Sequence, residues 1–182
     1  MHKLFAHLFI ISIIILLNGC ATHNKVTQDY KPDTDFRPYK TFSWHNYSSD
    51  VANADQVAIQ QAVEKQLNEQ GFTEVSGLSD LVLDLTIIKQ AASPSSTGLG
   101  ISIGLPIGRH GSIGLGTSKL LSNDNKMVAL IIVDITAQAS HQILWRGTAE
   151  NISLNDFKIQ NQAKLNATLR ALLEQFPPKP VK

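Results

Sequence analysis

Cysteine is almost absent from this 182-residue chain, which contains only one, Cys20. A single cysteine has no partner for an intramolecular disulfide, so disulfide bonds do not hold the fold. An excess of one charge is missing too. Sixteen Lys and Arg stand against fifteen Asp and Glu, and the numbers are equal once Lys3 is set aside with the N-terminal segment. Without a basic excess, we expect no nucleic-acid partner.

Long apolar runs are also lacking, apart from the segment Leu4 to Leu17 at the N-terminus. At about fourteen residues, it matches a signal-peptide core and is shorter than the roughly 20 residues of a membrane-spanning helix. The positively charged start, Met1 to Lys3, agrees with this interpretation. We therefore set residues 1–19 aside as a signal peptide before considering the fold.

The sequence Leu17-Asn18-Gly19-Cys20 follows the apolar core and resembles the lipidation signal of bacterial lipoproteins. The resemblance implies that Cys20 carries the lipid and becomes the new N-terminus. The alternative is a buried free thiol at a helix end. Ala21, in place of an aspartate, implies transfer to the outer membrane with the protein facing the periplasm. Residues 20–28 would then form a lipidated tether, residues 29–178 one domain and residues 179–182 a C-terminal tail.

Hydrophobic periodicity predicts an α+β fold. Apolar residues at helical spacing predict one helix from about Ala54 to Gln70, capped by Asn53 and ended by Gly71, and a second from about Asp156 to Gln175. Alternating and β-branched residues predict strands, which cover Tyr39 to Trp44, Phe72 to Val75, and segments starting at Asp80, Met127 and Gln142, with a first strand starting near Val26. We expect an antiparallel sheet with both helices packed on one face.

Seven of the eleven glycines lie between Gly98 and Gly116. Gly100 to Gly104 matches G-x-S-x-G, but β-branched neighbours flank Ser102 and no helix follows, so a nucleophile elbow is not expected. Phosphate-loop spacings fail as well. Apolar residues alternate instead, which predicts a β-hairpin with its turn at residues 108–111. The apolar face of this hairpin, here called the contact ribbon, is Leu99, Ile101, Ile103, Leu105, Ile107, Ile113 and Leu115. The ribbon faces the core, a partner or lipid.

Few other residues suggest chemistry. The four histidines after residue 20 form no close ligand pair, so no metal site is expected, and no cofactor is implied. Trp44 and Trp145 lie in core-rich strands, which favours packing over ligand stacking. No role is assigned to Asp134 and Arg146. Because no nucleophile, acid and base can be assembled, we expect no enzymatic activity and no catalytic residues.

Several segments occur in a characteristic order: DYKPDTDFRPYKTFSW, DLVL, the glycine-rich middle, ILWRGTAE and LLEQFPP. Together they resemble the bacterial lipoprotein family built on domain of unknown function 4136. The resemblance implies an envelope lipoprotein with an α+β fold and brings no catalytic residues. Our first hypothesis is a non-enzymatic accessory or interaction module that binds an envelope protein or itself. The alternative is a carrier with a small-ligand pocket between sheet and helices.

Overall fold

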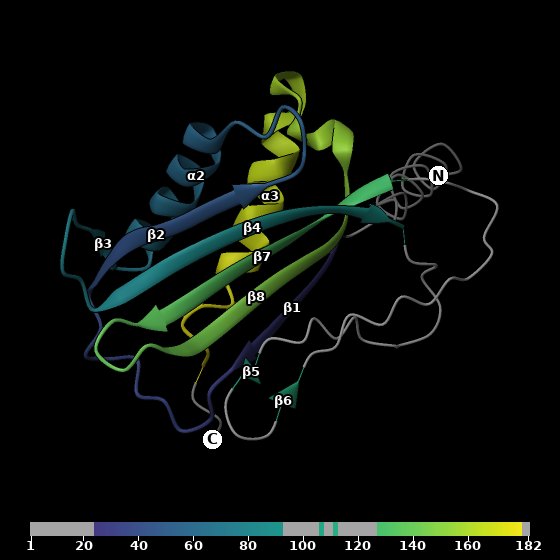
Figure 1. Ribbon diagram of the computed structural model, residues 1–182. Coiled ribbons are helices and arrows are strands. Elements are labelled where there is room, and N and C mark those ends of the chain that lie inside the picture. Colours follow the sequence, from purple (N-terminus) through teal and green to yellow (C-terminus); the bar gives the residue numbers. More distant parts are fainter. Residues whose placement is uncertain (1–23, 93–105, 108–110, 113–126, 180–182) are drawn as a thin grey trace, which may run out of the picture.

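A six-stranded sheet and two helices form the fold (Figure 1). The computed structural model describes residues 24–92, 106–107, 111–112 and 127–179. The strands are β1 (Lys25–Tyr30), β2 (Thr41–Ser49), β3 (Thr73–Glu74), β4 (Leu81–Ala91), β7 (Met127–Ala137) and β8 (Gln142–Ser153), in the order β1-β8-β7-β4-β2-β3. The helices are α2 (Gln56–Glu69) and α3 (Gln162–Leu173), and the short 3₁₀ turns η2 (Leu154–Phe157) and η3 (Ile159–Asn161) precede α3.

The sheet is mixed rather than purely antiparallel. Strands β1, β8, β7 and β4 pair antiparallel, whereas β2 pairs in parallel with both β4 and β3. The α+β class is confirmed, but the expected antiparallel direction is wrong for β2. Between β2 and β4 the chain passes through α2, and a helical crossover returns the chain so that the next long strand runs the same way. Strand alternation alone does not report this direction.

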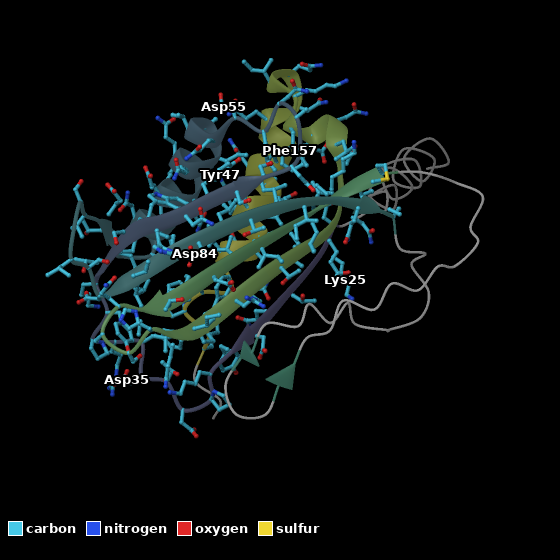
Figure 2. The ribbon with its side chains drawn as sticks, viewed as in Figure 1. Lys25, Asp35, Tyr47, Asp55, Asp84 and Phe157 are labelled. Atoms are coloured by element: carbon cyan, nitrogen blue, oxygen red, sulfur yellow. The ribbon has the colours of Figure 1, made fainter. Side chains whose placement is uncertain are left out.

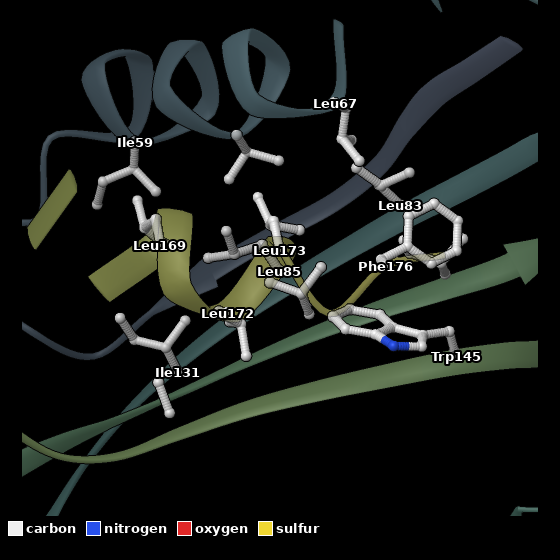
Figure 3. Close-up of a cluster of buried hydrophobic side chains, with 14 of the residues drawn as sticks. Ile59, Leu67, Leu83, Leu85, Ile131, Trp145, Leu169, Leu172, Leu173 and Phe176 are labelled. Atoms are coloured by element: carbon white, nitrogen blue, oxygen red, sulfur yellow. The ribbon is translucent and has the colours of Figure 1, made fainter. Parts of the chain in front are cut away.

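Both helices cover one face of the sheet, as the sequence predicts (Figure 1). Helix α2 buries Ile59, Val63 and Leu67, and α3 buries Leu165, Leu169, Leu172 and Leu173. Alternate residues of β4 and β7 meet them from the sheet: Leu81, Leu83, Leu85, Ile87, Ile131, Val133 and Ile135. Figure 3 shows this cluster, in which the Trp145 and Phe176 ring centroids are 5.4 Å apart. Both tryptophans belong to this packing, Trp145 fully buried and Trp44 at its margin, as predicted.

Glycine is required at Gly147, which lies beside the Trp145 ring on β8. A Cβ atom there would overlap the ring and approach the Leu172 side chain. The missing side chain therefore makes room for the largest buried residue of the core.

The ends of α2 follow local signals, with one difference from prediction. Gly71, with φ of +90°, follows the helix as predicted. The N-cap is Asp55 rather than Asn53, and its carboxylate accepts a hydrogen bond from the Ala58 N–H. Asn53 instead takes a left-handed backbone conformation, with φ of 71°, in the preceding turn. Asn and Asp suit both positions, so composition does not distinguish them.

The second predicted helix begins six residues late. Residues 154–161 form two 3₁₀ turns, and the α-helix covers only Gln162–Leu173. Lys158 separates the turns with an extended backbone, φ −75° and ψ 144°. The Ser153 hydroxyl accepts from the Asn155 N–H and so caps η2 rather than α3.

Within the glycine-rich segment, the structure describes only β5 (Pro106–Ile107) and β6 (Gly111–Ser112), which pair antiparallel. This contact brackets the predicted turn at residues 108–111. The remainder of the predicted hairpin lies outside the described residues and stays a prediction.

Candidate functional site

The sheet face opposite the helices, here called the open face, carries a row of polar residues. The strand registers place Asn46, Asp84, Asp134, Arg146 and Asp29 side by side on five neighbouring strands. Directly opposed residues on one face of a sheet have Cβ atoms roughly 5 Å apart, so neighbouring members of the row interact. Asp84 lies over the middle of the sheet in Figure 2.

Arg146 and Asp134 form a bidentate ion pair at the centre of this row. Arg146 Nε donates to Asp134 Oδ1 at 2.5 Å, and Arg146 Nη2 donates to Oδ2 at 2.6 Å. The Arg146 side chain is only 5% exposed and that of Asp134 15%. A shielded, two-pronged guanidinium–carboxylate pair is strong and geometrically specific. Sequence analysis assigned these residues no role, and only the register of β7 against β8 brings them together.

His45 and Asp84 form a second, more exposed pair in the row. A β-bulge between Trp44 and Asn46 sets His45 out of register, and His45 Nδ1 lies 2.8 Å from Asp84 Oδ1. Asp84 and Asp134, the two carboxylates at the centre of the row, therefore each contact a basic side chain on a neighbouring strand.

An apolar strip lies beside the polar row on the open face. Val128, Leu130 and Ile132 of β7 are 3%, 3% and 7% exposed, although they point away from the helix-covered core. They alternate with the core residues Ala129 and Ile131. The paired terminal residues of β4 and β7, Ala91 and Met127, lie at one end of this strip.

A cavity of about 440 Å³ lies at the end of the molecule where α2 and α3 begin. Its position differs from the predicted pocket between sheet and helices, because residues of the two helix starts and of η2 and η3 form it. The lining residues are Asn53, Asp55, Ala58, Ile59, Asp156, Phe157, Lys158, Ile159, Gln160, Gln162 and Leu165. Figure 2 labels Asp55 and Phe157 at this end.

The shifted carboxyl pKa values among the described residues have structural causes. The Arg37 side chain, by hydrogen bonding to Asp35, lowers the pKa of that carboxyl to about 2. Backbone N–H groups of Lys40 and Thr41, together with the Thr41 hydroxyl, lower the pKa of Asp80. Asp80 thereby fixes the start of β2 beside that of β4. Neither group lines the cavity.

Several predicted site residues lie outside the described residues. These are the lipidation candidate Cys20, the rejected nucleophile Ser102 and, of the contact ribbon, Leu99, Ile101, Ile103, Leu105, Ile113 and Leu115. Ile107 of the ribbon lies in β5, where it pairs with Gly111. The orientation of the ribbon face stays a prediction.

The described ranges contain neither a group of metal-binding side chains nor a membrane-spanning helix. There, no three His, Cys, Asp or Glu side chains are grouped to hold a metal ion. None of the helices in the same ranges is both long and apolar enough to cross a membrane.

The fold defines a two-layer α+β domain whose sheet is covered by helices on one face and polar along the middle of the other. The chain belongs to the DUF4136 family, named for a domain of unknown function, whose model matches residues 26–178. This match confirms the family predicted from the sequence. No match was found among curated protein sequences.

Two solved structures share the fold at low sequence identity, and a third matches with a lower TM-score. A PDZ domain protein from Parabacteroides distasonis is 15% identical with a TM-score of 0.53, and the match covers 87% of this chain but only 36% of that one. PelC from Paraburkholderia phytofirmans, a dodecamer, is 9% identical with a TM-score of 0.50, covering 87% of this chain and 100% of the other. A minor lipoprotein from Acinetobacter baumannii is 11% identical with a TM-score of 0.34, covering 76% and 89%.

Proposed function

We propose that this protein is a lipoprotein anchored in the outer membrane by a lipid on Cys20, with its domain in the periplasm. The observation that carries this proposal is the sequence Leu17-Asn18-Gly19-Cys20, which places the only cysteine directly after a signal-like apolar core. The family match begins at residue 26, and β1 begins at Lys25. The anchor would thus be only a few residues from the folded domain.

The lipid anchor is tested by feeding cells labelled palmitate and separating inner and outer membranes. The native chain is expected to carry label and to sediment with the outer membrane, whereas Cys20→Ala loses both. Several acyl chains are needed for stable anchoring, since one chain binds a bilayer only marginally. Label retained by Cys20→Ala would contradict the proposal, and label in the inner membrane would contradict only the location.

The proposed role is that of a non-enzymatic interaction module, with the open face and the contact ribbon as its contact surface. The open face supports this role, because its row offers the exposed His45 side chain beside the partly exposed Asp84, and exposed polar side chains are typical of the rim of an interface. The expected partner is another envelope protein or a second copy of the chain. No cofactor enters the proposal.

The contact surface is tested with matched charge insertions. Thr86→Arg places a cation on the open face in β4, whereas Gln61→Arg places one on the exposed side of α2. Sedimentation velocity and capture through an affinity tag at Lys182 are measured for both. We expect Thr86→Arg to remove self-association or a stoichiometric partner and Gln61→Arg to retain it. Equal self-association and partner capture by the two variants would exclude the open face as the contact surface.

A second candidate function is a small-ligand carrier, and the cavity between α2 and η2 favours it. Its volume of about 440 Å³ falls within the range of roughly 300–1,000 Å³ that small-molecule sites occupy. This function does not depend on lipidation, so the two candidates are tested separately.

A further inference from the structure

We infer that the cavity at the start of α2 and α3 binds a small molecule that carries an ammonium group on an apolar body. The inference rests on the second candidate function, the carrier, and adds the chemical class of its ligand. Four features support it: a carboxylate of low exposure, the charge of the lining, its apolar residues and an unsatisfied hydroxyl nearby.

Asp156 is the main recognition group. Its side chain lines the cavity, and the residue is only 8% exposed. No group among the described residues donates a hydrogen bond to its carboxylate or forms an ion pair with it. Its carboxylate oxygens, unlike the Tyr47 hydroxyl, keep some exposure and can be reached from the cavity. A ligand ammonium inserted into the cavity would supply both the charge and the N–H donors.

The second carboxylate of the cavity is already engaged. Asp55 Oδ1 accepts from the Ala58 N–H at 3.1 Å and caps α2. Its negative charge is therefore partly balanced by the helix N-terminus. Asp156 remains as the carboxylate available to a ligand. With Lys158 as the one basic residue of the lining, two negative charges face one positive charge, so the formal charge is −1 and favours a cation.

Apolar side chains form part of the cavity lining, beside its polar residues. Ile59, Phe157 and Leu165 line it and are themselves almost fully buried. They come from α2, η2 and α3, so their positions are fixed by the core rather than by a surface loop. Cavities lined in this way bind the apolar part of a ligand, while a few polar groups fix its orientation.

Tyr47 supplies a second unsatisfied polar atom at this end of the molecule. Its hydroxyl is buried and has no hydrogen-bond partner within the described residues. Burial raises the pKa of Tyr47, and the nearby negative charge of Asp55 raises it further, while Ser49 lies close enough to oppose part of the rise. The phenol is thus neutral at physiological pH, and it lies outside the cavity lining.

The test uses three probes of one shape: phenethylamine, 2-phenylethanol and phenylacetate. The full-length chain in zwitterionic nanodiscs is titrated with each, and Kd is followed at the methyl groups of Ile59 and Leu165. We expect the amine to bind about tenfold more tightly than the alcohol, in line with a charge-assisted hydrogen bond. Phenylacetate is expected to bind most weakly because Asp156 repels it.

Variants assign the effect to Asp156. Asp156→Asn keeps the shape and should lower amine affinity about tenfold. Asp55→Asn retains an N-cap and should change affinity much less, and Asp33→Asn, in the turn after β1, should not change it. The probe ranking on the native chain needs no variant, so it stands even if Asp156→Asn unfolds.

Three outcomes would overturn the inference. Equal affinities for amine and alcohol would leave a carrier without the proposed ammonium recognition. A preference for phenylacetate that Lys158→Gln removes would make Lys158 the recognition group. Failure of all three probes to shift either methyl signal would contradict both the inference and the carrier function, whereas lipidation at Cys20 would be untouched.

Discussion

Arg146 and Asp134 form a shielded ion pair on the open face. Both side chains are largely shielded from solvent. Two guanidinium nitrogens of Arg146 donate to the two carboxylate oxygens of Asp134. A buried pair of this kind adds little stability over an apolar pair of equal size, but removing one partner leaves a charge uncompensated.

We therefore expect Arg146→Met to lower the free energy of unfolding by about 3–5 kcal/mol. The double change Arg146→Met with Asp134→Leu should recover most of that loss. Urea unfolding measures both. The control is Arg37→Met, which breaks the exposed pair with Asp35 and should not move the midpoint, because exposed pairs contribute little. A double variant no more stable than Arg146→Met would contradict the argument.

Asp80 should make the stability of the protein depend on pH. Hydrogen bonds from the Lys40 N–H, the Thr41 N–H and the Thr41 hydroxyl lower the pKa of Asp80 below its ordinary 3.8. A carboxyl with a depressed folded-state pKa contributes stability above its unfolded pKa and loses it as pH falls through the folded value. Native protein should therefore exceed Asp80→Asn in stability at pH 7, and the gap should close below about pH 4.

Urea midpoints of the two proteins at pH 7 and pH 3 provide the measurement. Asp33→Asn serves as the control for general loss of a negative charge. If it shows the same gap as Asp80→Asn at pH 7, the hydrogen bonds of Asp80 are not the cause.

At the scale of elements, α3 holds its side of the core through one stripe of leucines. Leu169 is 1% exposed and packs between α2 and the sheet, whereas Leu78, in the loop before β4, is 92% exposed. Leu169→Ala should lower the free energy of unfolding by about 2–5 kcal/mol, from lost apolar contact and a cavity. Leu78→Ala makes the same chemical change and should leave stability within about 0.5 kcal/mol. Thermal unfolding compares them, and equal losses would place Leu169 outside the core.

Elements also show where sequence patterns reach their limit. The apolar period of α3 is clear from Leu165 to Leu173, and that helix was predicted. The start was misplaced, because the extended backbone of Lys158 is set by tertiary packing of η2. The parallel pairing of β2 with β4 does not follow from the sequence either. Apolar and polar residues alternate along a strand in the same way whether its neighbour is parallel or antiparallel.

At the scale of the whole molecule, the sheet joins the two ends of the domain. Strand β1, the first described element, pairs along its length with β8, close to the other end of the chain. Trp145 Nε1 donates to Gln28 of β1, and Trp44 Nε1 donates to Glu64 of α2. The two indoles therefore report on different parts of one core.

We expect these parts to unfold together, as single domains of this size usually do. In Trp44→Phe, fluorescence reports on Trp145 alone, and in Trp145→Phe it reports on Trp44 alone. Within each variant, the fluorescence and far-UV circular dichroism transitions in urea should coincide. Transitions that separate in either variant would show that β1 and β8 form a unit independent of β2 and α2.

The amino-acid sequence alone predicts the α+β class, most strands, the two helices and the family, and it shows the lone cysteine behind a signal-like segment. These follow from local periods of 2 and 3.6 residues and from short motifs, which a chain carries without folding. Only the tertiary structure decided that β2 runs parallel to β4, that Arg146 meets Asp134, and that Asp156 lines a cavity with Asp55. Those partners are 12 to about 100 residues apart, and strand register and helix packing, not local pattern, bring them together.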